Sequence, residues 1–543
     1  MMTVARRYPL IRSLTSYLEQ KTTILLVILL VLLTVLAWSN RFLQDDAFIS
    51  YRYADRLAHG HGLTWNDGER IEGYSNFLWV LLLSGAISVG LSPVSTSTAL
   101  GLCAFVISLL YTYKLAEEIL RSRTLAIGAV VLLGTNYTFS SYATGGLETQ
   151  CVTALGVLIA YCYFDSVTMN HWAIPRLVAI GLLATAMALT RLDSLIVGGL
   201  ILMLTVISFS KHSANRQHLA AGLLYLIGPM ILIIGCWFGW KLSYYGTILP
   251  NSFSAKASHA FNVLNGLKYL YRFTVSYLLF PFVLMGLLSS RALMRREHAY
   301  LWPIALVSIC WLVYVACVGG DFMEFRFMVP MLPFLFILIM WMICWYIRNK
   351  VICTAFLLLL PLGSVHHAMT FSYVSSDGIE SIQQLRNHLT ATDEQWSRIG
   401  QILGETFASS PNVIIATTAA GAIPYYSHLT TIDMLGINDP WVVEHGVHFE
   451  ETPGHTHIAT LKYLLERNVH LVIAHPLLLE ILEPITKLPI PPDETEVNLS
   501  HAAILEIPVD DHYRLIVLYL MRSEDVDRAI EAHHWRIHVL AKR

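Results

Sequence analysis

The chain has 543 residues, of which 55% are hydrophobic and only 14% are charged. Soluble globular proteins carry about 25% charged residues, so this composition excludes an ordinary soluble enzyme and indicates a polytopic membrane protein. The formal net charge of −2 gives no sign of nucleic-acid binding. All eight cysteines fall in apolar segments before residue 371, which favours small buried side chains over a disulfide or metal framework.

About eleven apolar segments are long enough to cross a bilayer, which takes about 20 helical residues. The first follows Arg6, Arg7 and Arg12 and has no cleavage site of small residues, so we expect a retained signal anchor. The apolar run 77–91 is shorter, and we expect it to be re-entrant or to lie in the membrane interface. The predicted spans are residues 22–40, 98–120, 124–141, 148–165, 174–190, 194–210, 219–242, 272–290, 299–318, 327–347 and 351–371.

Basic residues in the short connections test this threading, because cytoplasmic loops carry an excess of Lys and Arg. If 77–91 does not span, every short basic connection from Arg6 to Lys350 falls on one side of the membrane. If 77–91 spanned, all later connections would invert and the rule would fail repeatedly. The extracytoplasmic side then receives the segments richest in paired charge, which are 45–76, 145–149, 190–194, 244–256 and 319–326.

The pattern of the chain changes after about residue 371, where the apolar runs become short. Such runs between polar stretches predict β-strands, and residues 378–407 have a helical pattern. We therefore predict a transmembrane domain at 1–371 and a soluble α/β domain at 372–543 on the extracytoplasmic side. The predicted strands are residues 413–417, 470–474, 502–507 and 513–520.

The first outer loop carries two adjacent carboxylates, Asp45 and Asp46, and two guanidinium groups, Arg52 and Arg56. Ionisable side chains at membrane depth are costly, so they usually serve a site. A carboxylate can take the proton of an acceptor hydroxyl, and repulsion between two carboxylates can raise one pKa toward a useful value. A guanidinium group binds phosphate oxygens in pairs. These are the groups that an enzyme needs to transfer a sugar from a polyprenyl phosphate to a hydroxyl.

Side chains of the other outer segments extend this candidate site. Asp193 and Asp321 can orient the cations or bind sugar hydroxyls. The histidine pairs of the chain are not assigned to a metal, so no metal site is predicted, while a divalent cation at the paired aspartates stays open. The candidates for the donor phosphate are Arg52, Arg56, Arg191, Lys256 and Arg326, and those for sugar or acceptor are Glu72, Tyr74, Asn76, Glu148, Asp193, Asn251, Asp321 and His455.

Three motifs follow one another in the first outer loop. They are Asp-Asp-Ala-Phe-Ile-Ser-x-Arg at 45–52, Gly-x-Gly-Leu-x-x-Asn-x-Gly-Glu-Arg at 60–70 and Glu-Gly-Tyr-x-Asn-x-Leu-Trp at 72–79. Further motifs lie at 146–149, 245–256, 319–330, 433–439 and 454–455. In the three motifs of the first outer loop the chain resembles the membrane-embedded GT-C glycosyltransferases that use polyprenyl-phosphate sugars. In the combination of these motifs with the further ones it is most similar to the terminal arabinofuranosyltransferases of mycobacteria and their relatives.

The resemblance implies the GT-C fold, with interfacial helices in the first outer loop, and a catalytic aspartate at Asp45 or Asp46. It implies a donor such as decaprenyl- or undecaprenyl-phosphoryl-arabinofuranose and a glycan or pilin acceptor. It also implies a bacterial inner-membrane protein whose active site and C-terminal domain face the periplasm. The composition, rich in Ile, Ser, Thr and His, departs from that of mycobacterial proteins, so the acceptor need not be mycobacterial arabinan.

Two alternatives stay open at this level. The alternative function is a lipid-linked sugar transporter or flippase, although the chain shows no internal repeat of the kind that transporters usually carry. The alternative mechanism is a double displacement by two carboxylates in place of a single displacement, by analogy with retaining glycosidases. Residue types alone do not identify the sugar, the linkage or the oligomeric state.

Overall fold

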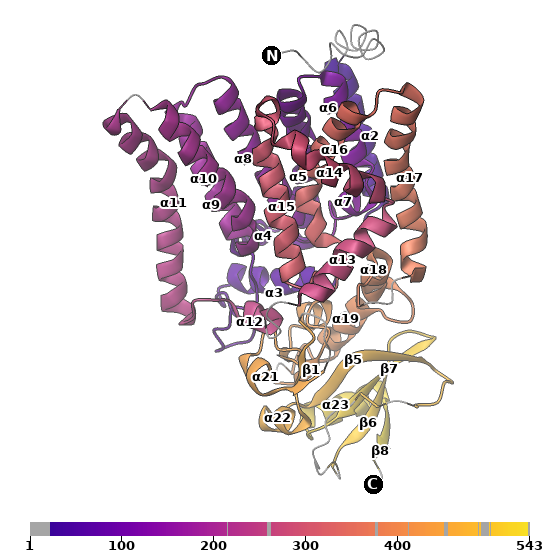
Figure 1. Ribbon diagram of the computed structural model, residues 1–543. Helices are drawn as coiled ribbons and strands as arrows, with labels where there is room; N and C mark the ends of the chain where they lie inside the picture. The colour runs from indigo at the N-terminus through magenta and orange to yellow at the C-terminus, as the bar shows by residue number, and fades with distance from the viewer. Residues whose placement is uncertain are drawn as a thin grey trace.

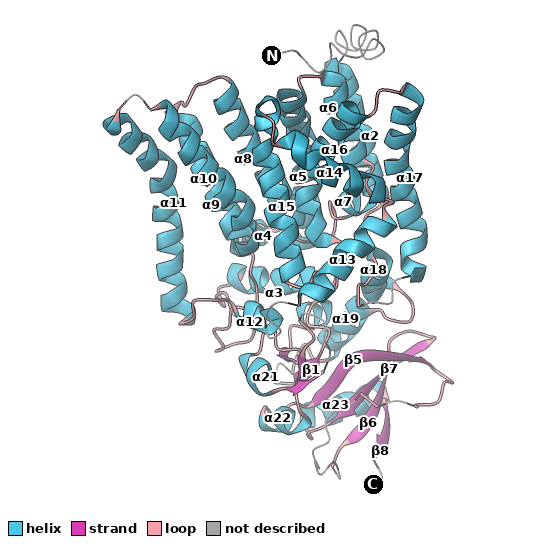
Figure 2. Cartoon of the chain, viewed as in Figure 1, coloured by secondary structure: helices cyan, strands magenta, loops and turns pink. Residues whose placement is uncertain are grey.

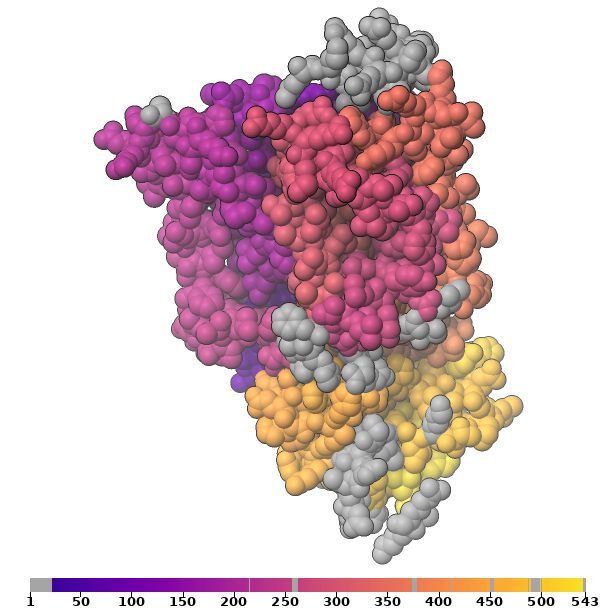
Figure 3. All heavy atoms as spheres, viewed as in Figure 1, coloured from indigo at the N-terminus to yellow at the C-terminus, as the bar shows by residue number. Residues whose placement is uncertain are grey.

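The computed structural model describes residues 22–213, 215–257, 262–374, 378–410, 412–449, 454–486, 488–489, 499 and 501–540. A bundle of helices is followed by a C-terminal region that contains a sheet and packs against one end of the bundle (Figure 1). The strands of the described chain are confined to that C-terminal region (Figure 2). In the space-filling view the region lies directly against the end of the bundle (Figure 3).

Within the described chain, 8 helices are long and apolar enough to cross a bilayer, and the count is up to 9 if a sharply bent pair forms one broken span. That pair is α13 (Val263–Ser276) and α14 (Phe280–Leu293), bent by 114°. The apolar helices α6 (Arg123–Gly134) and α9 (Ile174–Thr190) are shorter. The long helices are α2 (Thr22–Ser39), α5 (Pro93–Leu120), α8 (Thr149–Thr168), α10 (Leu195–His212), α11 (Arg216–Tyr245), α15 (Trp302–Cys317), α16 (Leu332–Tyr346) and α17 (Lys350–Val374).

All eleven predicted spans contain helix, but two of them are interrupted. The segment 124–141 divides into α6 and α7 (Tyr137–Ser141), because the side chain of Asn136 caps α7 by accepting from Phe139 N at 2.9 Å. The segment 272–290 breaks where Leu278 adopts a left-handed conformation with φ 55°. A proline then stands in the first turn of α14, where its missing N–H costs nothing.

The run 77–91 forms α4 (Phe77–Ser88), a helix of 12 residues. At 1.5 Å per residue such a helix covers about 18 Å, well short of the hydrocarbon layer of about 30 Å. Together with α3 (Asp46–Ala58) it makes the first outer loop helical, as expected. Figure 1 shows α3 between the bundle and the C-terminal region.

The C-terminal region contains a six-stranded sheet in the order β2-β1-β5-β7-β6-β8. Strand β1 pairs in parallel with β2 and β5, and the remaining pairs are antiparallel. The four predicted strands are confirmed as β1, β5, β6 and β7, whereas β2 and β8 were not predicted. The strands of this sheet are β1 (Ile414–Thr417), β2 (Thr430–Asp433), β5 (Leu471–Glu480), β6 (Ala503–Pro508), β7 (Tyr513–Tyr519) and β8 (Arg536–Val539).

Helices cover this sheet and connect it to the bundle. The helical pattern at 378–407 corresponds to α18 and α19, and a two-stranded sheet of β3 and β4 lies beside the main one. The smaller elements are α12 (Asn251–Ala257), α18 (Ile382–Thr390), α19 (Trp396–Thr406), α20 (Ala422–Ser427), α21 (Pro440–His445), β3 (Val447–His448), β4 (His457–Ile458), α22 (Leu461–Glu466), α23 (Glu524–His533) and the 3₁₀ helices Leu192–Ser194, Arg296–Leu301 and Arg326–Met331.

The N-terminus of α3 is bonded to the start of α20. Asp45 accepts hydrogen bonds from Gly421 N at 2.9 Å and from Ala422 N at 2.7 Å. Glycine is required at 421, because a Cβ there would lie 2.1 Å from the backbone oxygen of Asp45. Burial raises the pKa of Asp45 to about 7 and the charge of Asp46 adds to this, while the two amide donors and His388 oppose it. The carboxyl of Asp45 therefore joins the bundle to the C-terminal region.

Arg52, in the middle of α3, joins the same two parts. Its guanidinium donates to the carbonyl oxygens of Pro424 and, at 2.9 Å, of Leu429. Within its own loop it donates to Trp65 O at 3.1 Å and to Asn66 Oδ1 at 3.2 Å. The side chain is buried, so these carbonyl groups have no water to replace it. Asp45 and Arg52 are thus two polar clamps on one short helix.

We expect Arg52→Met to destabilise the protein by about 3 kcal/mol, because it leaves buried carbonyl groups without a donor. The matched control is Arg56→Met on the same helix. Arg56 pairs with Asp67, whose side chain is 77% exposed, and such a surface pair contributes about 1 kcal/mol or less. Thermal unfolding in detergent measures both effects. Equal losses in the two variants would contradict the clamp.

We expect Asp45 to make stability depend on pH. Its pKa is about 7 in the folded protein, against an ordinary value of 3.8, so the folded form holds the proton more tightly. Its contribution to stability is complete below pH 3.8 and is lost as the pH rises to about 7. Asp45→Asn removes this titration, so the melting temperature of the wild type relative to the variant should fall across that window. A difference that stays constant with pH would refute the assignment.

Candidate active site

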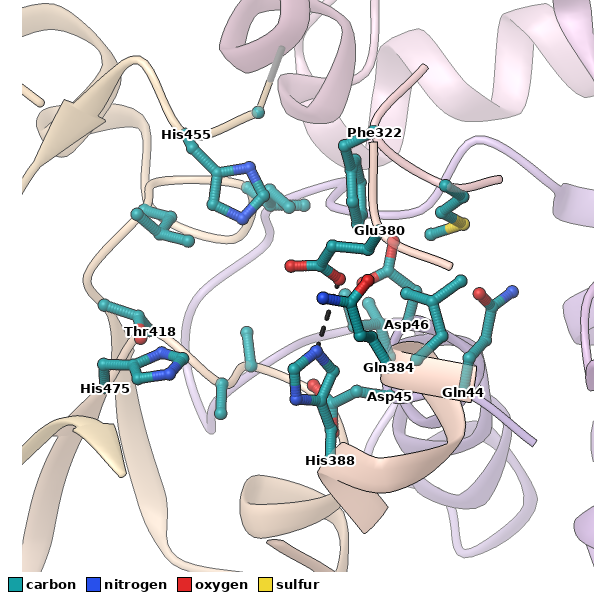
Figure 4. A pocket seen from close by; sticks show the side chains of 18 of the residues that line it. Gln44, Asp45, Asp46, Phe322, Glu380, Gln384, His388, Thr418, His455 and His475 are labelled. Atoms are coloured by element: carbon teal, nitrogen blue, oxygen red, sulfur yellow. Dashed lines mark hydrogen bonds and ion pairs between the residues drawn. The ribbon is translucent and has the colours of Figure 1, made fainter. Parts of the chain in front are cut away.

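A cavity of about 590 Å³ lies between the end of the bundle and the C-terminal region (Figure 4). Its bundle side is formed by the start of α3 and the loop 319–326, and its other side by α18, the loop after β1 and the strand β5. This volume is typical of a site for a small ligand. The polar and aromatic side chains that line it are Gln44, Asp45, Asp46, Phe322, Glu380, Gln384, His388, Trp396, Thr418, His455 and His475.

The two adjacent aspartates differ in their surroundings. Both oxygens of Asp45 accept from backbone amides of the C-terminal region. Asp46 lines the same cavity, and no other residue of the described chain makes a hydrogen bond or ion pair with its carboxylate. Gln44 beside them is buried, and both polar atoms of its amide lack a protein partner among the described residues. Asp46 is therefore the member of the pair that is available to a ligand.

The far wall of the cavity carries a histidine held between two carboxylates. His388 Nε2 lies 3.3 Å from Glu380 Oε2, and His388 Nδ1 is bonded to Glu394. The ring stacks on Trp396 with centroids 4.4 Å apart. Although burial disfavours the charged ring, the bonds to Glu380 and Glu394 raise the pKa of His388 to about 10. His388 is therefore an imidazolium at neutral pH.

A hydrogen bond and ion pairs connect three of the predicted outer segments. Asn76 Nδ2 donates to Glu148 Oε2 at 2.8 Å, and Arg191 Nη1 lies 3.5 Å from Glu148 Oε1. Arg191 also binds Asp193 through Nε at 3.0 Å and Nη2 at 2.5 Å. Tyr314 donates to the same carboxylate at 3.3 Å. The structure thus brings together four residues that the sequence singled out.

A fourth outer segment adds a second arginine–aspartate pair. Arg326 Nε donates to Asp321 Oδ2 at 2.6 Å. The guanidinium groups of Arg326 and Arg191 lie 5.5 Å and 5.4 Å from the ring centroid of Phe327. Neither arginine lines the cavity, but the charge of Arg326 interacts with that of Asp46. The two cations of this cluster therefore lie on the bundle side of Asp46.

Other predicted residues support the loop instead of lining the cavity. Glu72 forms a buried ion pair of 2.7 Å with Lys241, and Tyr74 bonds the hydroxyl of Tyr245 at 3.1 Å. Asn251 donates through its side chain to the carbonyl oxygens of residues 436 and 437 at 2.7 Å and 2.9 Å. Lys241 was missed by the sequence reading, although a lysine inside an apolar run is itself a signal.

The remaining predictions for the donor phosphate have different outcomes. The hydrogen bonds of Arg52 go to protein oxygens, and Arg56 pairs with Asp67, so the geometry assigns both to the framework of the loop. The side chain of Lys256 lies outside the described residues. His455, which was predicted for sugar or acceptor, does line the cavity, and its buried Nδ1 has no hydrogen-bond partner in the part of the chain that the structure describes.

Glu380, His388 and His475 are cavity residues that sequence reasoning missed. They lie far along the chain from Asp46, in stretches whose pattern indicates only an ordinary helix and strand. Among the described residues, no group of three or more His, Cys, Asp or Glu side chains is arranged to hold a metal ion.

Two proteins of the same name are similar to this chain in sequence. The chain is 28% identical over 284 residues to the terminal beta-(1->2)-arabinofuranosyltransferase of Mycobacterium tuberculosis, which covers 49% of this chain and 44% of that protein. It is 24% identical over 345 residues to the protein of the same name from Corynebacterium glutamicum, covering 56% of this chain and 48% of that protein. The chain thus matches about half the length of these curated relatives. Residues 383–530 match a family described as a domain of unknown function (DUF8728).

Solved structures share the architecture of nearly the whole chain. ArnT from Cupriavidus metallidurans bound to undecaprenyl phosphate superposes with a TM-score of 0.53 and 14% identity, over 92% of this chain and 98% of that chain. The same protein in the apo state gives a TM-score of 0.51 over the same shares. ArnT is a GT-C glycosyltransferase. The chain therefore has the GT-C fold, and its relatives by sequence are terminal arabinofuranosyltransferases.

Proposed function

We propose that this protein is a membrane glycosyltransferase that moves a sugar, D-arabinofuranose, from a polyprenyl phosphate to a hydroxyl of a cell-envelope acceptor. One observation carries the proposal. Within a GT-C fold, Asp46 presents a carboxylate without a protein partner in the described chain to a cavity of about 590 Å³, next to a cluster of arginines. Catalysis of glycosyl transfer needs such a carboxylate beside the reacting sugar and cations near the departing phosphate.

The name of the two relatives supports arabinofuranose as the sugar, and the undecaprenyl phosphate bound to ArnT supports a polyprenyl-phosphate donor. The donor is then decaprenyl- or undecaprenyl-phosphoryl-arabinofuranose. In this proposal Arg326 and Arg191 neutralise the phosphate from the bundle side. Each is already paired with an aspartate, so the phosphate has to compete with Asp321 and Asp193 for their guanidinium groups.

The proposal places the reaction on the extracytoplasmic face of a bacterial inner membrane. The basic connections of the sequence favour the cytoplasm for the opposite end of the bundle, and the cavity lies at the end that carries the C-terminal region. The acceptor, a glycan or a pilin, then reaches the cavity from the periplasm. No observation favours the transporter alternative, since the paired charges gather at one end of the bundle.

We expect Asp46→Asn to lower sugar transfer by about 10²- to 10⁴-fold while the protein stays folded, because the amide cannot act as a carboxylate. Purified protein in detergent, incubated with labelled decaprenyl-phosphoryl-arabinofuranose and envelope acceptors, measures the rate. Asp55→Asn is the control, since Asp55 lies on the same helix and pairs with the exposed His59.

Activity equal to wild type in Asp46→Asn would remove this residue from the mechanism. If the wild-type protein releases no sugar from any polyprenyl-phosphate donor in detergent, then the proposed function itself is wrong. A transporter would give that result, because without a vesicle it has no two compartments between which to move lipid.

A further inference from the structure

Glu380 lines the cavity (Figure 4). It belongs to the C-terminal region and lies next to Met323 of the loop 319–326. Its backbone is fixed on both sides, because its N–H donates to Phe322 O at 2.6 Å and its carbonyl accepts from Glu324 N at 2.9 Å. Met323 and Glu380 form an isolated parallel bridge. The start of the C-terminal region is thus bonded to the loop that also carries Arg326, so the position of Glu380 relative to the arginine cluster is set by backbone contacts.

One carboxylate oxygen of Glu380 is held by a neighbouring side chain and the other is not. Its Oε2 lies 3.3 Å from His388 Nε2, while Oε1 makes no hydrogen bond with any other described residue, and 40% of the side chain is exposed. Glu394 fixes the far side of the same imidazolium through Nδ1. Although burial opposes it, His388 keeps the pKa of Glu380 below its ordinary value. One oxygen of an ionised carboxylate therefore remains open to the cavity.

The two open carboxylates of the cavity come from different parts of the chain. Asp46 comes from the bundle, where the charge of Arg326 reaches it. Glu380 comes from the C-terminal region, where His388, His455 and His475 face it. A lipid-linked donor has its polyprenyl chain in the membrane, so its sugar enters from the bundle side. The acceptor then occupies the side next to Glu380.

We propose that Glu380 is the general base that takes the proton of the acceptor hydroxyl, with His388 as the residue that positions it. This inference rests on the proposed function. In the step, the acceptor O–H proton passes to Glu380 Oε1 and the acceptor oxygen forms a bond to the anomeric carbon. The bond from that carbon to the phosphate oxygen breaks, and its electron pair leaves with the polyprenyl phosphate. Asp46 stabilises the positive charge that develops on the sugar ring.

Glu380→Gln tests this role with little risk to the fold, because both backbone contacts remain and the amide oxygen can still accept from His388. We expect its turnover number to fall by about 10²-fold or more, with the KM for the donor unchanged. The matched control is Glu394→Gln, which removes the other carboxylate from the same imidazolium but does not line the cavity. We expect that control to lose less than about tenfold, as a residue that acts only through His388.

Rescue by azide distinguishes a general base from a residue with a purely structural role, because azide replaces a missing base but does not repair a distorted site. The azide anion attacks the anomeric carbon without a proton to lose, forming a C–N bond as the C–O bond to phosphate breaks. It should therefore restore donor consumption in Glu380→Gln, with a glycosyl azide as product, and should not do so in Asp46→Asn. Mass spectrometry of the released sugar detects that product.

The outcomes separate the two hypotheses. If the wild type transfers sugar and Glu380→Gln matches it, or falls no further than Glu394→Gln, then Glu380 is not the base and the proposed function stands. A slow Glu380→Gln that azide does not rescue also overturns the assignment. If the wild type consumes no polyprenyl-phosphate donor, with or without azide, both proposals fall.

Discussion

The contact between α3 and the C-terminal region is the constraint on which the rest of the site depends. The cavity has walls from both parts, so it exists only while they are held in register. Polar clamps from one short helix hold them, through backbone groups of residues that follow it by more than 300 positions. Such bonds are directional, and each leaves a buried group unpaired if it is broken. They therefore fix the relative position of the two parts better than apolar packing alone would.

The paired aspartates show how environment separates two identical side chains. Both carboxylate oxygens of Asp45 accept hydrogen bonds from the amides at the start of α20, whereas the carboxylate of Asp46, one position later, lines the cavity. The same helix carries two arginines with an equally clear division, since Arg52 is buried among carbonyl groups and Arg56 pairs with an exposed aspartate. A motif in a sequence therefore marks a place in the fold, and the contacts decide which of its residues can meet a substrate.

Much of the fold could be predicted because it follows from hydrophobic pattern. The spans and the helix at 77–91 are continuous apolar runs, and the four central strands are short apolar runs between polar stretches. The breaks near Asn136 and Leu278 could not be predicted, because a side-chain cap and a left-handed residue leave the average hydrophobicity unchanged. Strands β2 (Thr-Thr-Ile-Asp) and β8 (Arg-Ile-His-Val) were missed because neither contains two apolar residues in a row.

The residues of the candidate site also fall into those that the sequence predicts and those that it does not. Glu148, Arg191, Asp193 and Arg326 stand out in sequence because they interrupt apolar segments, and the structure brings them into one cluster. Glu380 has no such signal, because a glutamate at the start of an amphipathic helix in a polar region is unremarkable. Only its backbone bonds to the loop 319–326 bring it into the cavity.

The resulting distribution of charge suits a reaction between a lipid and a water-soluble partner. Cations gather on the bundle side, where a phosphate attached to a membrane lipid has to stay. The carboxylate and imidazolium of the C-terminal region lie where the proposed acceptor would bind. Their attraction to each other keeps Glu380 ionised without placing a free cation near the acceptor hydroxyl, which would compete with the phosphate site. Under the proposed function, the acceptor wall is able to vary with the C-terminal region while the donor wall stays with the bundle.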